Sequence, residues 1–161
     1  MSKMLRILLA CVLFLMWATS AHAVDTIHAF GPDSLKQIMA SHTGKPYVIV
    51  VWGLDCAYCQ ASFAALAEAQ RARKFTVVTI ATDPADDPQA RRLIMKKLQA
   101  SGLASQIWAF GDAPVEQLRY AIDPKWFGEL PRTYWINAQG EKRAHSGALS
   151  KAVIDKLSSH W

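Results

Sequence analysis

One stretch decides the fold: Val48-Ile-Val-Val-Trp52-Gly-Leu-Asp-Cys56-Ala-Tyr-Cys59-Gln60. Its first part is a run of apolar, β-branched residues, which is too short for a helix of its own and typical of a buried strand. Its second part opens the segment 56–73, which is rich in Ala, Gln, Glu and Leu and therefore predicts a helix. The sequence thus places two cysteines at the start of a helix that closely follows a buried strand.

The two cysteines are candidates for redox chemistry. A thiolate at a helix N-terminus faces unpaired backbone N–H groups and the positive end of the helix dipole, which lowers its pKa from about 8.5 into the range of roughly 3.5 to 7.5. The i, i+3 spacing brings Cys59 onto the same helical face, within reach of a mixed disulfide held on Cys56. We therefore predict that Cys56 is the nucleophile and Cys59 the resolving thiol.

Two structural roles compete with this prediction. A purely structural disulfide between Cys56 and Cys59 would close a loop of only four residues, which stabilises a fold less than a long loop does. A structural zinc ion needs four ligands, and the sequence has no second cysteine pair or close histidine pair to supply them. The redox role is favoured over both, and no metal site is expected.

The N-terminal segment predicts export. Residues 1–23 contain a basic start, the twelve-residue apolar run 7–18 and the small-x-small sequence Ala21-His-Ala23, which together are typical of a secretory signal peptide. The alternative is an uncleaved membrane anchor, but a spanning helix needs about 20 apolar residues. We expect the mature chain 24–161 to form one domain in the periplasm.

Cysteine use and charge agree with export. Of the three cysteines, Cys11 lies within the predicted signal, so the mature chain keeps only Cys56 and Cys59. A lone Cys-x-x-Cys pair in an oxidising compartment indicates redox exchange more than a disulfide scaffold. Removal of Lys3 and Arg6 lowers the formal net charge from +5 to +3. The remaining basic clusters have no interleaved aromatic residues, so no nucleic-acid binding is expected.

The rest of the chain alternates predicted strands with predicted helices. Apolar alternation or β-branched runs predict strands at 26–30, 48–51, 75–81, 106–110, 131–136 and 141–146. Apolar residues at helical spacing predict helices that begin after Asp33 or Ser34, at Cys56, after Asp87-Pro88, after Pro114 and after Ser150. The residues expected on their buried faces include Leu35, Ile38, Met39, Leu93, Ile94, Leu98, Val115, Leu118, Ile122, Val153, Ile154 and Leu157.

This order predicts an α/β fold. Its central mixed sheet would combine parallel strands with a C-terminal antiparallel hairpin, and helices would cover both faces. The cysteines would then lie at the carboxyl end of a central strand, where open α/β sheets place their functional sites.

With these elements in place, the chain resembles the thioredoxin superfamily, and within it the exported TlpA-like or ResA-like thiol–disulfide oxidoreductases. The resemblance covers about residue 47 to the end. It rests on Trp52, on Cys56-Ala-Tyr-Cys59 and on the segment Leu130-Pro131-Arg-Thr-Tyr-Trp-Ile136-Asn-Ala-Gln-Gly140. The predicted fold class is therefore the thioredoxin fold.

The resemblance also implies a partner-binding surface formed by Trp52, Tyr58, Leu130 and Pro131. It implies that the Leu130–Pro131 bond is cis and faces the cysteines. Such a bond turns the preceding backbone outward and leaves N–H and C=O groups free to pair with an extended substrate chain. The proline alone would favour the alternative, a trans bond at the start of a strand.

The chain departs from the family pattern beside the cysteines. Asp55 stands where the family usually has Trp, and its carboxylate is read as an N-cap in preference to a group that tunes the thiol. Val50 occupies the position where thioredoxin carries a buried acid, so no proton shuttle is carried over. Glu129 is read as a surface carboxylate. Arg132 is read either as a solvated edge residue or as a group that attracts an acidic substrate or stabilises a thiolate.

The resemblance implies an enzyme that exchanges a Cys56–Cys59 dithiol or disulfide with protein partners. It would act as a monomer and need no organic cofactor, because the dithiol carries both electrons. Its role would be that of a reductant in cytochrome c or copper-centre assembly, recharged by a membrane electron donor. The alternative is a copper-binding chaperone on the same fold that uses Cys56, Cys59 and His145, although copper-insertion relatives space their cysteines by three residues. A peroxiredoxin-type peroxidase is disfavoured because its Pro-x-x-x-Thr-x-x-Cys setting is missing.

Overall fold

A computed structural model describes residues 26–161, which form a six-stranded mixed sheet covered by five helices. The strands are β1 (Ile27–Phe30), β2 (Tyr47–Trp52), β3 (Thr76–Pro84), β4 (Gln106–Phe110), β5 (Arg132–Ile136) and β6 (Lys142–Ser146). The helices are α2 (Ser34–Ser41), α3 (Ala57–Ala72), α4 (Pro88–Ser101), α5 (Val115–Ile122) and α6 (Lys151–Ser158). The predicted signal peptide 1–23 and the mature start at Val24 lie outside the described residues.

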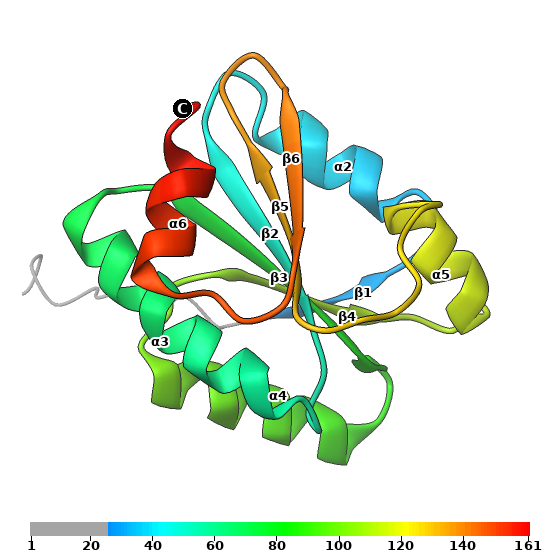
Figure 1. Ribbon diagram of the computed structural model, residues 1–161. Helices are drawn as coiled ribbons and strands as arrows, with labels where there is room; N and C mark the ends of the chain where they lie inside the picture. The colour runs from blue at the N-terminus through cyan, green and yellow to red at the C-terminus, as the bar shows by residue number, and fades with distance from the viewer. Residues whose placement is uncertain (1–25) are drawn as a thin grey trace, which may run out of the picture.

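Strand β2 lies in the middle of the sheet, whose order is β1-β4-β3-β2-β5-β6 (Figure 1). It pairs in parallel with β3 and antiparallel with β5, and each of its six residues is buried. Burial on both faces explains why its sequence is a continuous apolar run instead of an alternating one. The predicted central strand, the mixed sheet and the terminal hairpin of β5 and β6 are confirmed.

Helices cover both faces of the sheet, as predicted. Val48, Val50 and Trp52 point into one core with residues of α3, α4 and α6, whereas Ile49 and Val51 point into a second core with residues of α2 and α5. In Figure 1, α3, α4 and α6 accordingly lie on one side of the sheet and α2 and α5 on the other. The alternating side-chain directions of one strand therefore serve two hydrophobic cores.

The helix starts follow the predicted capping for α4 and α6. The Asp87 carboxylate accepts from the N–H groups of Gln89 and Ala90, and the Ser150 hydroxyl accepts from Val153 N–H. Three residues predicted to face the core are instead exposed: Met39 (45%), Leu93 (38%) and Val115 (50%). Their helices bury a narrower stripe than the apolar spacing indicates, because each lies on one face of the sheet only.

Strand β3 is longer than predicted. The sequence prediction ends it at Ala81, but it continues to Pro84 through a change of register against β4. Such an irregularity re-aims the side chains beyond it, here Thr82 and Asp83. None of the helices that the structure describes in residues 26–161 is both long and apolar enough to cross a membrane.

An ion-pair network ties the loop before β5 to the hairpin. The Arg132 guanidinium, whose side chain is only 14% exposed, donates to the Asp123 carboxylate at 3.1 Å and to the Ser146 hydroxyl. It also pairs with Glu129 and donates to the Tyr134 hydroxyl. Arg132 is therefore not a solvated edge residue, so that interpretation is wrong. Its donors are held inside this network.

Asp123 is the most enclosed acid of the network. Burial pushes its pKa up, but hydrogen bonds from Lys125 N–H, Arg132 and the Tyr134 hydroxyl outweigh burial and hold the pKa below its usual value. A carboxylate with a depressed pKa stabilises the fold at every pH above its unfolded pKa, and this contribution disappears as the pH falls through the folded pKa.

Replacing Arg132 tests this network. Arg132→Met should lower the free energy of unfolding by about 2–4 kcal/mol at neutral pH, because it leaves the half-buried Asp123 charge without its cation. The loss should shrink as the pH falls below the usual range of an aspartate, where Asp123 becomes protonated in the folded protein. Chemical denaturation at several pH values measures both effects.

The matched control is Lys36→Met, which removes an ion pair with Asp33 whose side chains are 85% and 77% exposed. Its cost should stay below about 1 kcal/mol at all pH values, as for other surface pairs. Equal losses in the two variants would contradict a special role for the buried network.

Candidate active site

The two cysteines form a disulfide at the start of α3. Cys56 is the N-cap residue of the helix, and Cys59 lies in its first turn, with the two Cα atoms 5.4 Å apart. Cys56 N–H donates to the carbonyl of Gly53, and Cys59 N–H donates to the carbonyl of Cys56. The pair therefore occupies the helix N-terminus at the carboxyl end of β2, as predicted.

The two sulfurs differ in access. Cys56 is half-buried, whereas Cys59 is only 1% exposed and points from α3 into the core. A nucleophile must meet a partner from outside, whereas a resolving thiol needs to reach only its neighbour. This difference supports the predicted assignment of Cys56 as nucleophile and Cys59 as resolving thiol.

Asp55 does not cap α3. The N-cap residue is Cys56, and no side chain accepts a capping hydrogen bond at this end of the helix. Asp55 is exposed beside the disulfide. The prediction of an Asp55 N-cap is therefore wrong, because the helix begins one residue later than that role requires.

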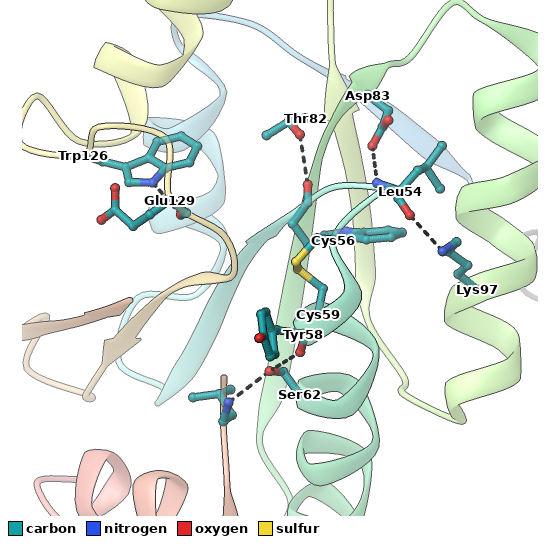
Figure 2. Close-up of a disulfide and its surroundings, with 12 residues drawn as sticks. Leu54, Cys56, Tyr58, Cys59, Ser62, Thr82, Asp83, Lys97, Trp126 and Glu129 are labelled. Carbon is teal, nitrogen blue, oxygen red and sulfur yellow. Dashed lines mark hydrogen bonds between the residues drawn. A yellow bond between two sulfur atoms is a disulfide. The ribbon is translucent and has the colours of Figure 1, made fainter. Parts of the chain in front are cut away.

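The turn between β2 and α3 is held by side chains from β3 and α4. The Asp83 carboxylate accepts from Leu54 N–H at 2.9 Å, and the Lys97 ammonium donates to the Leu54 carbonyl at 2.8 Å. Figure 2 shows the Leu54 peptide groups between these two side chains, close to Cys56. The Thr82 hydroxyl adds a hydrogen bond to the carbonyl of Trp52. The backbone that leads into the nucleophile is thus fixed from outside its own segment.

Gly53 allows this close packing. A Cβ atom there would lie 3.1 Å from the Thr82 hydroxyl and 3.3 Å from a methyl group of Leu130. Both distances are tighter than ordinary contacts, so a larger residue would require the Thr82 and Leu130 side chains to shift by a few tenths of an ångström.

Asp83 is an ionisable group that the sequence analysis missed. Burial raises its pKa, the hydrogen bond from Leu54 N–H lowers it, and the nearby Asp55 carboxylate raises it again, with a net upward shift. The sequence signal that could have identified Asp83 was its position just after the β-branched run 75–81, which forms a strand parallel to β2. Parallel strands end at the same edge of a sheet, but the longer β3 and its change of register were not predicted.

A cleft of about 520 Å³ opens beside Cys56. Its walls come from the turn and the start of α3, from the end of β3, and from the loop before β5; the lining residues are Gly53, Leu54, Asp55, Cys56, Ala57, Tyr58, Thr82, Asp83, Gly128 and Leu130. The structure thus brings Leu130 to the same cleft as Cys56 and Tyr58, although more than 70 residues of sequence separate Leu130 from them.

The Leu130–Pro131 peptide bond is cis. Among residues 26–161, neither the N–H nor the C=O group of Leu130 has a hydrogen-bond partner, whereas the Pro131 carbonyl accepts from Gly147 N–H. The Leu130 peptide groups are therefore the part of this segment that is left for another chain.

The other predicted surface residues divide into two kinds. Tyr58 is 70% exposed at the cleft, beside the disulfide (Figure 2). Trp52 is completely buried and packs edge-on against Phe63, and Pro131 is also buried. The expectation that the Trp52 and Pro131 side chains line the binding surface is therefore corrected, because both pack beneath it.

The ligand set considered for copper does not assemble. In the part of the chain that the structure describes, no three His, Cys, Asp or Glu side chains are grouped closely enough to hold a metal ion. His145 lies on β6, paired in register with Thr133 of β5, and does not join Cys56 and Cys59.

Ser62 anchors the first turns of α3. Its fully buried hydroxyl donates to the Tyr58 carbonyl and accepts from Leu149 N–H at 3.0 Å (Figure 2). Ser62→Ala should lower the free energy of unfolding by about 1–3 kcal/mol, because it leaves the buried Leu149 N–H unpaired. Denaturant unfolding measures this loss. Ser41→Ala, which removes an exposed helix hydroxyl bonded only to the Ile38 carbonyl, should change stability by less than about 0.5 kcal/mol.

Solved structures with similar folds place this geometry in context. A secreted disulfide oxidoreductase of Mycobacterium tuberculosis, homologous to E. coli DsbE, matches with 21% identity and a TM-score of 0.59, over 76% of this chain and 86% of that one. A thioredoxin-family thiol:disulfide interchange protein from Chlorobium tepidum matches with 23% identity and a TM-score of 0.57, over 76% and 83% of the two chains. A thioredoxin-related protein from Neisseria meningitidis serogroup B matches with 18% identity and a TM-score of 0.59, over 74% and 86%.

No protein-family model matches the sequence. No curated protein matches it at a significant level either. The similarity to solved structures lies below 25% identity, and it is a similarity of fold. The resemblance drawn from the cysteine motif and the Pro131 segment is confirmed at that level: the chain has the thioredoxin fold of these structures.

Proposed function

We propose that this protein is an exported thiol–disulfide oxidoreductase that exchanges its Cys56–Cys59 pair with protein partners. One observation carries the proposal: a half-buried cysteine opens onto a cleft at a helix N-terminus, and its disulfide partner is buried behind it. A purely structural disulfide gains nothing from this placement. An exchange reaction requires it, because attack must come from outside and resolution from inside.

In the reducing direction, the Cys56 thiolate attacks one sulfur of a partner disulfide. A bond forms between Cys56 and that sulfur, the partner's disulfide breaks, and its second sulfur leaves as a thiolate that takes a proton from solvent. The Cys59 thiol then loses its proton and attacks Cys56, which forms the Cys56–Cys59 disulfide and releases the first partner sulfur as a thiol. Two electrons pass to the partner, and the oxidising direction is the reverse.

The backbone dipoles of α3 favour the attacking thiolate. The helix has 16 residues, and its first N–H groups have no acceptor within the helix. Negative charge on Cys56 is stabilised at this position by the helix dipole. No organic cofactor is required in this proposal, because the dithiol itself carries both electrons.

An extended partner segment would bind across the cleft. The unpaired N–H and C=O groups of Leu130 offer hydrogen bonds to a peptide backbone, and the exposed ring of Tyr58 offers apolar contact. We infer protein thiols and disulfides as substrates, since small thiols would not need this surface.

A more specific role and compartment are supported by the resemblance to TlpA-like proteins. They are also supported by one structural neighbour, the mycobacterial oxidoreductase, which is secreted. We propose that the protein acts as a monomer in the periplasm, after removal of a signal peptide, and that it reduces partners in cytochrome c or copper-centre assembly. A membrane electron donor would return the pair to the dithiol form.

A mixed-disulfide trap tests the exchange. In Cys59→Ala, the attack by Cys56 has no resolving thiol, so covalent adducts with partner proteins should accumulate and disappear on reduction. Non-reducing electrophoresis of tagged protein from an exporting host measures the adducts. Cys56→Ala is the matched control and should form none through Cys59, which is buried.

Insulin serves as a test disulfide for the reduced protein. The unsubstituted protein should accelerate insulin reduction, and either cysteine variant should fail to turn over. An unsubstituted protein that neither reduces insulin nor leaves adducts in the Cys59→Ala form would contradict the proposed function.

Tyr58 tests the binding surface. Tyr58→Ser should raise KM for a protein disulfide about two- to tenfold with little change in kcat, the effect of losing an exposed aromatic contact of about 0.5–1.4 kcal/mol. Tyr120→Ser is a close control, because Tyr120 is 68% exposed on α5 and does not line the cleft. Steady-state kinetics compares the two variants, and equal KM values would remove Tyr58 from the binding surface.

A further inference from the structure

The Leu54 peptide groups are held between two opposite charges. Asp83, at the end of β3, accepts from Leu54 N–H, and Lys97, on α4, donates to the Leu54 carbonyl (Figure 2). Leu54 lies two residues before Cys56 and lines the same cleft. Neither charged group belongs to the segment that carries the cysteines, so their contacts with it exist only in the folded chain.

Asp83 shares the cleft with Cys56. Both residues contribute to its wall, together with the exposed Asp55. The charged groups that act on Asp83 are Asp55, from the turn after β2, and Lys97, from α4. No ion pair within 4 Å joins Asp83 to Lys97 among the described residues, although the charge of Lys97 lowers the pKa of Asp83.

We propose that Asp83 and Lys97 are positioning residues for Cys56. Both hold the turn before this nucleophile, and their opposite charges change the stability of the Cys56 thiolate in opposite directions. This inference rests on the proposed function, since a thiolate matters only if the pair is redox-active. Neither residue hydrogen-bonds to the reacting sulfurs. Both act through the turn and through the electrostatic field of the cleft.

The Asp83 carboxylate opposes the thiolate. Two negative charges in one partly desolvated cleft repel each other, which raises the pKa of the thiol and destabilises the dithiol form whenever Cys56 is ionised. A less stable dithiol form is a stronger electron donor, because the pair gains more free energy on closing to the disulfide. Asp83 therefore favours the reducing role.

Lys97 acts with the opposite sign. Its ammonium group, fixed at the Leu54 carbonyl, favours negative charge nearby and so stabilises the Cys56 thiolate. The two residues have the same structural task on the turn but opposite electrostatic tasks. This difference separates the proposal from a purely structural clamp.

Two charge-neutralising variants keep the hydrogen-bonding groups. Asp83→Asn retains a side-chain oxygen to accept from Leu54 N–H, and Lys97→Gln retains an N–H donor on a shorter side chain. Asp83→Asn should fold normally. It removes a carboxylate charge that burial disfavours, and it keeps a side-chain oxygen that accepts from Leu54 N–H. Unfolding curves recorded beside the redox measurements identify any variant that is destabilised.

The experiment measures two quantities for the full chain carrying each variant. The first is the pKa of Cys56, from thiolate absorbance or the pH dependence of alkylation. The second is the equilibrium constant with glutathione at a pH above the Cys56 pKa of the unsubstituted protein, where the dithiol form carries the thiolate. Asp86→Asn and Lys96→Gln serve as controls, since both residues are exposed and neither lines the cleft.

We expect the Cys56 pKa to fall in Asp83→Asn and to rise in Lys97→Gln. The equilibrium constant should shift about three- to tenfold toward the dithiol in the first variant and by a similar factor toward the disulfide in the second. A tenfold change corresponds to about 30 mV for this two-electron couple. The control variants should change either quantity by less than about twofold, because their charges are screened by solvent.

Shifts of the same sign in the two variants, or shifts no larger than those of the controls, would overturn the proposal. Failure of the proposed function is a separate result: the unsubstituted reduced protein would then not reduce insulin at all. If the unsubstituted protein reduces insulin but the two variants do not shift the Cys56 pKa and the equilibrium constant in opposite directions, only the roles of Asp83 and Lys97 are rejected.

Discussion

The burial of β2 on both faces is the constraint on which the rest of the structure depends. Its side chains alternate between two cores. A shift of the strand by one residue would therefore move every side chain of β2 from one core to the other. This register fixes where the strand ends. Cys56, the N-cap of α3, lies four residues after that end. The position of the nucleophile is therefore set by packing, before any chemistry of the cysteine is considered.

The opposite wall of the cleft is held by packing and by electrostatics. The loop that carries Gly128 and Leu130 is anchored by the buried ring of Trp126, and the network around Arg132 joins its two ends to the hairpin of β5 and β6. Glu129 takes part through the Ser146 hydroxyl, and Trp126 donates to the Glu129 carbonyl inside the loop (Figure 2). A residue remote from the sulfurs thus helps to hold Leu130 at the cleft.

The field in the cleft combines contributions of both signs. The dipole of α3 and Lys97 favour a thiolate on Cys56, whereas Asp55 and Asp83 oppose it. A thioredoxin fold supplies the helix dipole wherever it occurs, but the acids and the lysine come from this particular chain. In the proposed exchange reaction, the balance among these charges would set the reduction potential of the Cys56–Cys59 pair.

The sequence alone determined the order of the strands and helices, the central strand, the cysteine pair and its place at a helix start, because all of these depend on contacts between near neighbours and on apolar periodicity. Only the tertiary structure decided that Asp83 and Lys97 meet at Leu54, that Arg132 is enclosed by acids, and that Trp52 lies beneath the site. Those facts depend on the length of β3, on the lateral order of the strands and on which helix face meets the sheet. Such choices follow from the packing of segments far apart in the chain, and no local pattern records them.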